Sequence, residues 1–297
     1  MTIDVISLFC GAGGSCEGYK QAGCNVIAGV DNNRKVLDVY ACNHPKSKPI
    51  FGDLSKVTAN KLLNACSKKK GELDILDSSS PCPGVSMVGQ RIHRKKKTPI
   101  LEVPSNKLFF DNIRLIGGIM PKVFILENVT GQYKGIMRPF FFEYLSLLRG
   151  KGYIVKSQSL FACWYEVPQL RERTIIIGVR KDINMQPVFP KPCNKIITLA
   201  EVIPDVIAQK IEQFDHSWES ANKPAHTITK RRMFKIATKD GAERYPNIDE
   251  LKKICSFPNH YILKGSYDEQ WGMLGNAVPP KLMKHIALTV RKKIFIA

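Results

Sequence analysis

The sequence IDVISLFCGAGGSCEGYKQAG, residues 3–23, joins an apolar run, a glycine cluster and a helix-compatible segment. Similar apolar runs follow at residues 25–31, 73–76, 122–128, 153–160 and 174–180. They are nearly continuous in Val, Ile, Leu and Phe, as strands covered on both faces must be. Helix-compatible segments lie between them at residues 15–22, 34–41, 59–69, 105–119 and 138–151. The alternation predicts an α/β protein with a doubly wound, mostly parallel sheet and a Rossmann-like topology.

A change of pattern after residue 180 predicts a second region. The proline-rich run QPVFPKPCNK indicates that the chain leaves the sheet there. From this run to about residue 265 the pattern of apolar and polar residues is less regular. The stretch WGMLGNAVPPKLMKHIALTVRKKI then predicts a turn and a last amphipathic helix that returns to the first domain. We therefore expect one domain from residues 1–180 plus 266–297, and a small irregular region at 181–265.

Composition limits the classes of function. The chain has 297 residues with 45 Lys and Arg against 26 Asp and Glu, a formal charge of +19, which favours a polyanionic partner such as nucleic acid. No apolar run approaches the ~20 residues of a membrane span, and no signal peptide is recognisable. Nine cysteines without a C-x-x-C pair predict neither a disulfide framework nor a zinc site. We expect an intracellular protein, without membrane contact or metal.

The glycine cluster lies where a ligand could approach the backbone. Gly11 and Gly13 follow the first strand and precede a helix, while Asp31 ends the second strand and Asp53 follows a third. Such glycines admit a ligand at a helix N-terminus, and an acid at the end of the second strand can bind ribose hydroxyls. The G-x-G-G spacing differs from G-x-G-x-x-G, which disfavours a nicotinamide dinucleotide and favours another adenosyl ligand. Turn glycines without any ligand are the alternative.

One cysteine stands out by its surroundings. Cys82 lies between Pro81 and Pro83, where the fourth strand passes into a loop, and a strongly basic stretch follows. The carboxyl edge of an open α/β sheet is where such folds present their chemistry, and flanking prolines restrict the backbone around the thiol. A structural cysteine in a turn remains the alternative reading.

Charged residues end or precede the neighbouring strands. Glu127 ends the apolar run FILENV, and a carboxylate there is costly unless it is paired or functional. Arg171 and Arg173 precede another strand, and their spacing lets both guanidinium groups point at one site. A structural Arg–Glu pair would explain each alone, whereas thiol, carboxylate and arginines together predict a catalytic edge.

With these motifs in order, the chain resembles the cytosine-C5 DNA methyltransferase family. LFCGAGG resembles its S-adenosylmethionine loop, SPCPGVS its nucleophile loop and ENV its catalytic glutamate. NKLFFD resembles a helix lining the cofactor pocket, QLRER the arginine motif and GNAVPP the closing motif. The resemblance spans most of the chain and implies methyl transfer from S-adenosylmethionine to C5 of a flipped-out cytosine, without a metal.

The resemblance also implies a role for each matching residue. Cys82 would attack cytosine C6, Glu127 would hold N3 and the exocyclic amine, Arg173 would contact O2, and Arg171 would hold the site in place. For the cofactor, the matching positions are Phe9, Gly11, Gly13, Asp31 (ribose), Asp53 and Leu54 (adenine), and Asn276 and Val278. The basic loop after Cys82 would close over the flipped base and contact phosphate through Arg91, Arg94, Lys95, Lys96 and Lys97, and Thr227 lies in a segment that resembles the family's threonine motif. By their charge, Arg231 and Arg232 are further candidates for phosphate contacts.

Several alternatives remain open from sequence alone. The same chemistry on transfer RNA is one, although the cysteine–phenylalanine–threonine signature of that branch is not found. A catalytically silent nucleic-acid-binding relative is another, because Pro83 stands where the family usually has glutamine. Both basic stretches could also be solvated faces. We expect a monomer acting on double-stranded DNA in the cytoplasm or nucleoid, as part of a restriction-modification system or as a viral self-marking enzyme.

Overall fold

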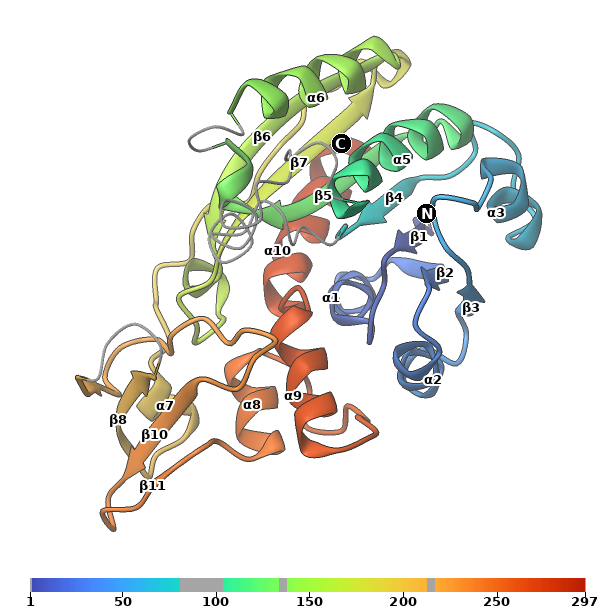
Figure 1. The fold of residues 1–297 in the computed structure, drawn as a ribbon. Coiled ribbons are helices and arrows are strands. Elements are labelled where there is room, and N and C mark those ends of the chain that lie inside the picture. Colours follow the sequence, from blue (N-terminus) through green and yellow to red (C-terminus); the bar gives the residue numbers. More distant parts are fainter. Residues whose placement is uncertain (1, 81–103, 134–137, 213–216, 297) are drawn as a thin grey trace.

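A computed structural model describes residues 2–80, 104–133, 138–212 and 217–296. Its main feature is a seven-stranded sheet in the order β3-β2-β1-β4-β5-β7-β6 (Figure 1). The strands are β1 (Asp4–Leu8), β2 (Asn25–Asp31), β3 (Lys48–Phe51), β4 (Ile75–Ser78), β5 (Val123–Val129), β6 (Tyr153–Phe161) and β7 (Glu172–Arg180). The predicted doubly wound α/β sheet is confirmed.

One strand departs from the parallel pattern. β7 inserts between β5 and β6 and runs antiparallel to both, with Val129 opposite Arg173 and Tyr153 opposite Arg180. The connection from β6 to β7 contains only the 3₁₀ turn η4 (Ala162–Tyr165). A parallel return needs a crossover of a dozen or more residues, so this short connection favours an antiparallel one. The start of β7 therefore lies beside the end of β5.

Helices cover both faces of this sheet. Val5 belongs to a cluster with residues of α1 (Gly14–Gln21), α2 (Arg34–Asn43) and α10 (Pro280–Val290). Its neighbour Ile6 belongs to a second cluster with residues of α3 (Ala59–Ala65), α5 (Pro104–Ile119) and α6 (Arg138–Gly150). Successive strand residues point to opposite faces, so continuous apolar strands are expected where both faces are covered.

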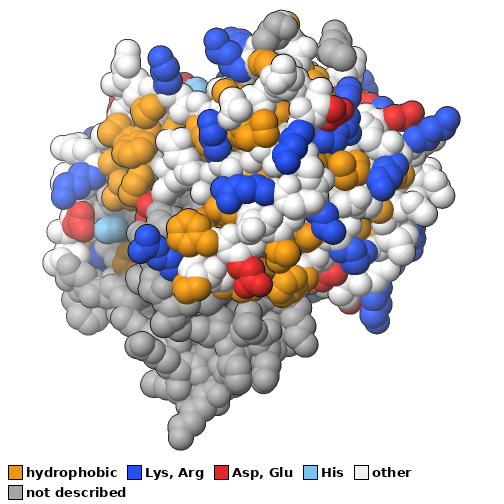
Figure 2. Space-filling view, turned by 90° about the horizontal axis from the view of Figure 1, so that it is seen from above, with side chains coloured by type: hydrophobic (Ala, Val, Ile, Leu, Met, Phe, Trp, Pro, Cys, Tyr) orange, Lys and Arg blue, Asp and Glu red, His pale blue; other side chains and the backbone are white. Residues whose placement is uncertain are grey.

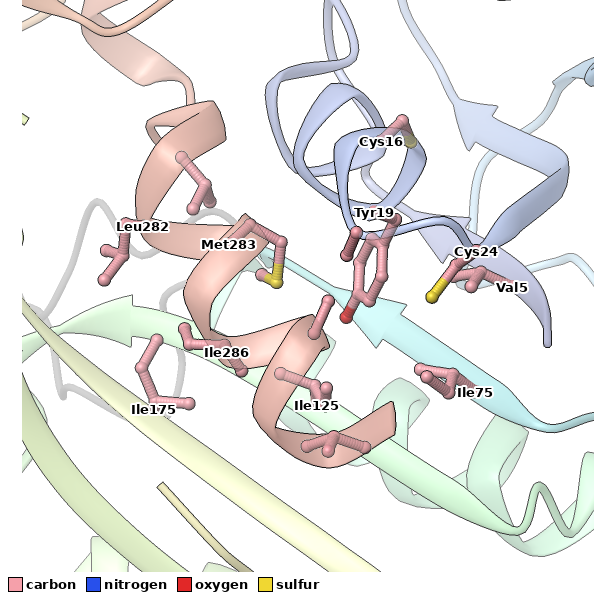
Figure 3. Packing of buried hydrophobic residues seen from close by; sticks show 14 of the residues in the cluster. Val5, Cys16, Tyr19, Cys24, Ile75, Ile125, Ile175, Leu282, Met283 and Ile286 are labelled. Atoms are coloured by element: carbon pink, nitrogen blue, oxygen red, sulfur yellow. The ribbon is translucent and has the colours of Figure 1, made fainter. Parts of the chain in front are cut away.

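The packing of α1 against α10 is especially close. Figure 3 shows Tyr19 of α1 beside Met283 and Ile286 of α10, over the strands that carry Ile75 and Ile125. A Cβ added at Gly18 would lie 2.5 Å from the carbonyl oxygen of Pro280, so only glycine lets the two helices approach this far. The C-terminal helix thus completes the core around the first strand.

The region after β7 contains a second sheet of four short antiparallel strands in the order β11-β10-β8-β9 (Figure 1). Its elements are α7 (Leu199–Val202), β8 (Val206–Ile211), β9 (Glu219–Ser220), β10 (Phe234–Thr238), β11 (Glu243–Arg244), α8 (Ile248–Ile254) and α9 (Tyr267–Asn276). A third apolar cluster joins α7, β8, β10 and α8 and extends to Trp271 and Leu274 of α9, beyond residue 265. The domain division at 180 and 265 stays a prediction.

Two sequence-based element predictions were wrong in detail. The stretch that begins at Trp271 was expected to open with a turn, but its first residues form the end of α9, because Ser266 and Glu269 build a capping box that starts a helix at Tyr267. The helix expected over 59–69 ends at Ala65. Further short helical elements in the described part of the chain are η2 (Thr130–Tyr133), η5 (Lys181–Ile183) and the π-helical turn η6 (Arg291–Phe295). Among the described residues, no helix is long and apolar enough to cross a membrane.

Candidate functional site

The centre of the candidate site is a buried ion pair at the end of β5. Arg173 Nε lies 2.9 Å from Glu127 Oε1, and Glu127 is only 8% exposed. The antiparallel register sets this contact, because it places the start of β7 beside the last residues of β5. Burial lowers the pKa of Arg173, and the neighbouring Glu127 carboxylate partly offsets this shift. The pair therefore presents a positioned carboxylate at the carboxyl edge of the sheet.

Arg171 contacts a different set of groups. It is 3% exposed, and its Nη1 donates to the carbonyl oxygens of Ile228 at 3.1 Å and Gly275 at 3.0 Å. Burial lowers its pKa to about 9. Thr227 Oγ1 donates to the carbonyl of Leu170 at 2.5 Å, next to this arginine. The two arginines thus have separate partners: Arg173 holds Glu127, and Arg171 attaches the segment around Thr227 to the sheet.

The strand β5, which carries Glu127, also binds the residue at which the chain after β4 enters the predicted nucleophile loop. Asn128 Nδ2 lies 3.2 Å from the carbonyl oxygen of Ser80 and 3.3 Å from its Oγ. Ser80 is the last described residue before the loop. The predicted nucleophile and the basic residues after it lie outside the described residues: Cys82, Arg91, Arg94, Lys95, Lys96 and Lys97.

The predicted cofactor loop adopts an unusual backbone. Phe9, Gly11 and Gly13 all have positive φ, at 53°, 53° and 94°. This conformation is strained for a bulky residue such as Phe9, and such strain concentrates at functional sites. Asp31 Oδ2 accepts from the amide of Gly11 at 3.0 Å, which joins the end of β2 to the loop. Burial raises the pKa of Asp31, and backbone N–H donors partly offset this shift.

The remaining predicted cofactor residues lie in different environments. Asp53 is exposed and accepts from the amide and hydroxyl of Ser55, at 3.0 and 2.8 Å. Leu54 is buried, and its carbonyl accepts from Arg114 Nη2 of α5 at 2.6 Å. Asn276 is exposed at the end of α9, whereas Val278 is buried in the cluster that contains α1.

The predicted nucleic-acid residues after Thr227 also differ from one another. Arg231 is exposed. The guanidinium of Arg232 stacks 4.6 Å from the ring centre of Tyr245, and its Nη1 lies 3.4 Å from Asp268. Arg232 is therefore already engaged within the fold, and Arg231 is the freer of the two to reach a partner. Basic side chains are spread over the face shown in Figure 2, with fewer acidic ones among them.

Sequence reasoning missed a buried acid on β4. Asp77 is 1% exposed and accepts from Ser7 Oγ at 2.7 Å and Tyr19 Oη at 3.2 Å. Burial is the main cause that raises its pKa to about 7. The signal was present, because an acid inside an apolar strand is as costly as one at its end. Among the described residues, no group of three or more His, Cys, Asp or Glu could hold a metal ion.

Comparison with known proteins identifies the family of this chain. The family model described as C-5 cytosine-specific DNA methylase matches residues 3–247, which includes the glycine loop, Glu127, both arginines and Thr227. The chain belongs to this family. The resemblance drawn from the six sequence motifs is thereby confirmed.

Proteins similar in sequence to this chain support the same family assignment. The Type II methyltransferase M.XorII of Xanthomonas oryzae is 32% identical over 216 residues, covering 72% of the chain and 48% of the relative, so the chain spans about half of that protein. M1.HphI of Haemophilus parahaemolyticus is 27% identical, covering 98% of the chain and 87% of the relative.

Solved structures show the same fold at lower sequence identity. A structure described as a DNA modification methyltransferase encoded within an E. coli prophage has a TM-score of 0.81 at 17% identity, covering 98% of this chain and 99% of the other. DNMT2 of Spodoptera frugiperda has a TM-score of 0.73 at 18% identity, covering 99% and 100%. At these identities the likeness establishes the shared fold alone.

Proposed function

We propose that this protein transfers a methyl group from S-adenosylmethionine to C5 of cytosine in double-stranded DNA. The observation that carries the proposal is the buried Arg173–Glu127 pair at the end of β5, in a chain of the C-5 cytosine-specific DNA methylase family. A carboxylate fixed at this edge can bind the N3 and amino edge of a cytosine. The arginine beneath it keeps the carboxylate oriented.

The chemistry needs a nucleophile, because C5 of cytosine is not reactive by itself. Cys82 attacks C6 as a thiolate, and the ring electrons that leave the C5–C6 bond make C5 nucleophilic. Glu127 supports protonation at N3, and Arg173 is the residue we assign to O2. Transfer of the methyl group to C5 would leave S-adenosylhomocysteine as the second product. The C5 proton then passes to solvent while the Cys82 thiolate leaves C6, which restores the aromatic ring.

The residues around the glycine loop fit an adenosyl cofactor. A Cβ at Gly11 would meet nothing within 4 Å, so one side of the loop is open to a ligand. α1 has Gly13 as its N-cap and no side-chain cap, which suits a helix N-terminus that receives a carboxylate. Phe9, Asp31, Asp53, Leu54, Asn276 and Val278 are the further residues we assign to cofactor binding. S-adenosylmethionine, when bound, supplies an electrophilic methyl group on its sulfonium.

Double-stranded DNA is the proposed substrate. A charge of +19 favours binding to a phosphate backbone, and each neutralised phosphate lowers the log–log salt slope of binding by about 0.9. We assign phosphate contacts to Arg231 and to the basic residues after Cys82. Residues 181–265 are the proposed target-recognition region, and residues 1–180 with 266–297 the catalytic domain.

The proposal is tested by methyl transfer with radiolabelled S-adenosylmethionine and either DNA or transfer RNA. We expect label at cytosine C5 of DNA, lost in Cys82→Ala and retained in Cys42→Ala, a matched control at an exposed cysteine of α2. DNA containing 5-fluorocytosine should become covalently attached to the wild-type protein but not to Cys82→Ala. Label on transfer RNA alone would show that RNA and not DNA is the substrate. Label on neither nucleic acid would contradict the proposed activity.

A further inference from the structure

Two buried side chains from distant parts of the sequence meet beneath the glycine loop. Tyr261 follows α8, and His44 is the C-cap residue of α2. Tyr261 Oη donates to the carbonyl oxygen of Ala12 at 2.5 Å and lies 3.1 Å from His44 Nε2. Their exposed fractions are 1% and 5%. A tyrosine from the C-terminal third of the chain thus contacts the backbone of the loop assigned to the cofactor.

The hydrogen bonds of this pair have a fixed direction. The Tyr261 hydroxyl has one proton, which it gives to Ala12, so it can only accept from His44. The imidazole must then carry its proton on Nε2. The resulting chain from imidazole to hydroxyl to carbonyl is buried throughout, where consecutive hydrogen bonds strengthen one another.

The same two side chains fill the space next to Gly13. A Cβ at this residue would clash with His44 Nε2 and would lie 2.7 Å from Tyr261 Oη. Gly13 also has a φ of 94°, which favours glycine. The turn of the loop is therefore enclosed on one side by the histidine and tyrosine, while Gly11 faces open space on the other.

Tyr261 is itself held firmly by its neighbours. The side chain of Asn43 binds both the amide and the carbonyl of Ile262 at 2.8 Å, which fixes the residue after Tyr261 to the end of α2. The ring of Tyr261 also packs edge-on against Phe257 at 4.8 Å. Because its backbone and ring are both fixed, Tyr261 can impose a position on the loop.

We infer that His44 and Tyr261 are positioning residues that hold the loop from Gly11 to Gly13 in its cofactor-binding form. The inference rests on the proposed function, because that function places the adenosyl ligand at this loop. Tyr261 belongs to the apolar cluster of the second sheet, so that cluster is directly connected to the cofactor loop. Neither residue is expected to touch the reacting atoms.

The first test measures binding of S-adenosylhomocysteine by calorimetry without DNA. Tyr261→Phe keeps the ring and removes the hydrogen bond to Ala12, and we expect affinity to fall about fivefold or more, as for the loss of one buried hydrogen bond. Tyr153→Phe is the matched control. Tyr153 of β6 is equally buried, and its hydroxyl donates to the carbonyl oxygen of Pro121 at 2.7 Å. This variant should lose similar thermal stability while keeping its affinity.

A second readout does not depend on ligand. Hydrogen exchange of the peptide that contains Gly11 and Gly13 should accelerate in Tyr261→Phe and in His44→Gln, but not in Tyr153→Phe. In turnover, the KM for S-adenosylmethionine should rise while the KM for DNA and kcat stay near wild type.

The outcomes separate the two proposals. Unchanged loop exchange in a folded Tyr261→Phe, or an equal loss of affinity in Tyr153→Phe, would overturn the positioning role. Failure of the wild type to bind S-adenosylhomocysteine would instead contradict the proposed function, and the exchange experiment would still decide the role of the pair.

Discussion

The buried acid on β4 leads to a specific prediction about stability and pH. Asp77 has a pKa raised from 3.8 to about 7, chiefly because burial destabilises its charged form. Between these two values the folded state binds a proton that the unfolded state has already released. Stability from this group is therefore fully present below about pH 4 and is lost as pH rises through 7.

The magnitude follows from the shift. Each pH unit between the two pKa values corresponds to about 1.4 kcal/mol, and about two such units lie between pH 5 and the folded pKa of about 7. About 3 kcal/mol of the free energy of unfolding should therefore be lost between pH 5 and pH 8 through Asp77 alone. Asp77→Asn removes the titration. The difference in unfolding free energy between wild type and variant should therefore change by about this amount, in favour of the variant at the higher pH.

Urea unfolding at pH 5 and pH 8 measures both free energies, and subtracting the variant removes the contribution of every other titrating group. Ser7→Ala provides a second test, because the Ser7 hydroxyl donates to the carboxylate at 2.7 Å and favours its charged form. Its loss should raise the pKa of Asp77 further. If wild type and Asp77→Asn show the same change between pH 5 and pH 8, the assignment of the raised pKa to Asp77 is refuted.

Three further predictions concern stability. Glu127→Ala should lower the free energy of unfolding by about 3–5 kcal/mol in urea titrations, because it leaves the Arg173 guanidinium buried and unpaired; a loss below 1 kcal/mol would contradict this. Gly275→Ala should cost about 1–3 kcal/mol, because its Cβ would clash with a backbone carbonyl, whereas Gly150→Ala, with nothing within 4 Å, should not lower the thermal midpoint. His44 has a pKa lowered to about 4 by burial, so stability should fall by about 3 kcal/mol as pH drops from 6.5 to 4, and this fall should be missing from His44→Gln.

Sequence patterns predicted the sheet well because its strands are continuous apolar runs. The strand expected over 25–31 was found with the same bounds, and the other main-sheet strands differ by a few residues at most. The antiparallel direction of β7 was not predicted, since residue types carry no direction and the decisive signal was the short connection before it. That direction brings Arg173 against Glu127.

The candidate site was harder to predict from sequence where it depends on long-range contacts. The spacing of Arg171 and Arg173 suggested that both guanidinium groups point at one site, yet their partners lie on different elements. His44 and Tyr261 are 217 residues apart, and neither belongs to a recognisable motif. Only the folded chain brings such pairs together. Local periodicity shows which face of a helix or strand is buried, but not which other element packs against that face.

The close packing of α1 and α10 has a consequence for how the protein is made. The helix α1 emerges from the ribosome before α10, and the surface that covers it is translated more than 250 residues later. Until then the nascent chain exposes the apolar side of its first strand and helix. Biosynthesis of this protein should therefore be sensitive to premature termination, and incomplete chains should aggregate or be degraded instead of accumulating as folded fragments.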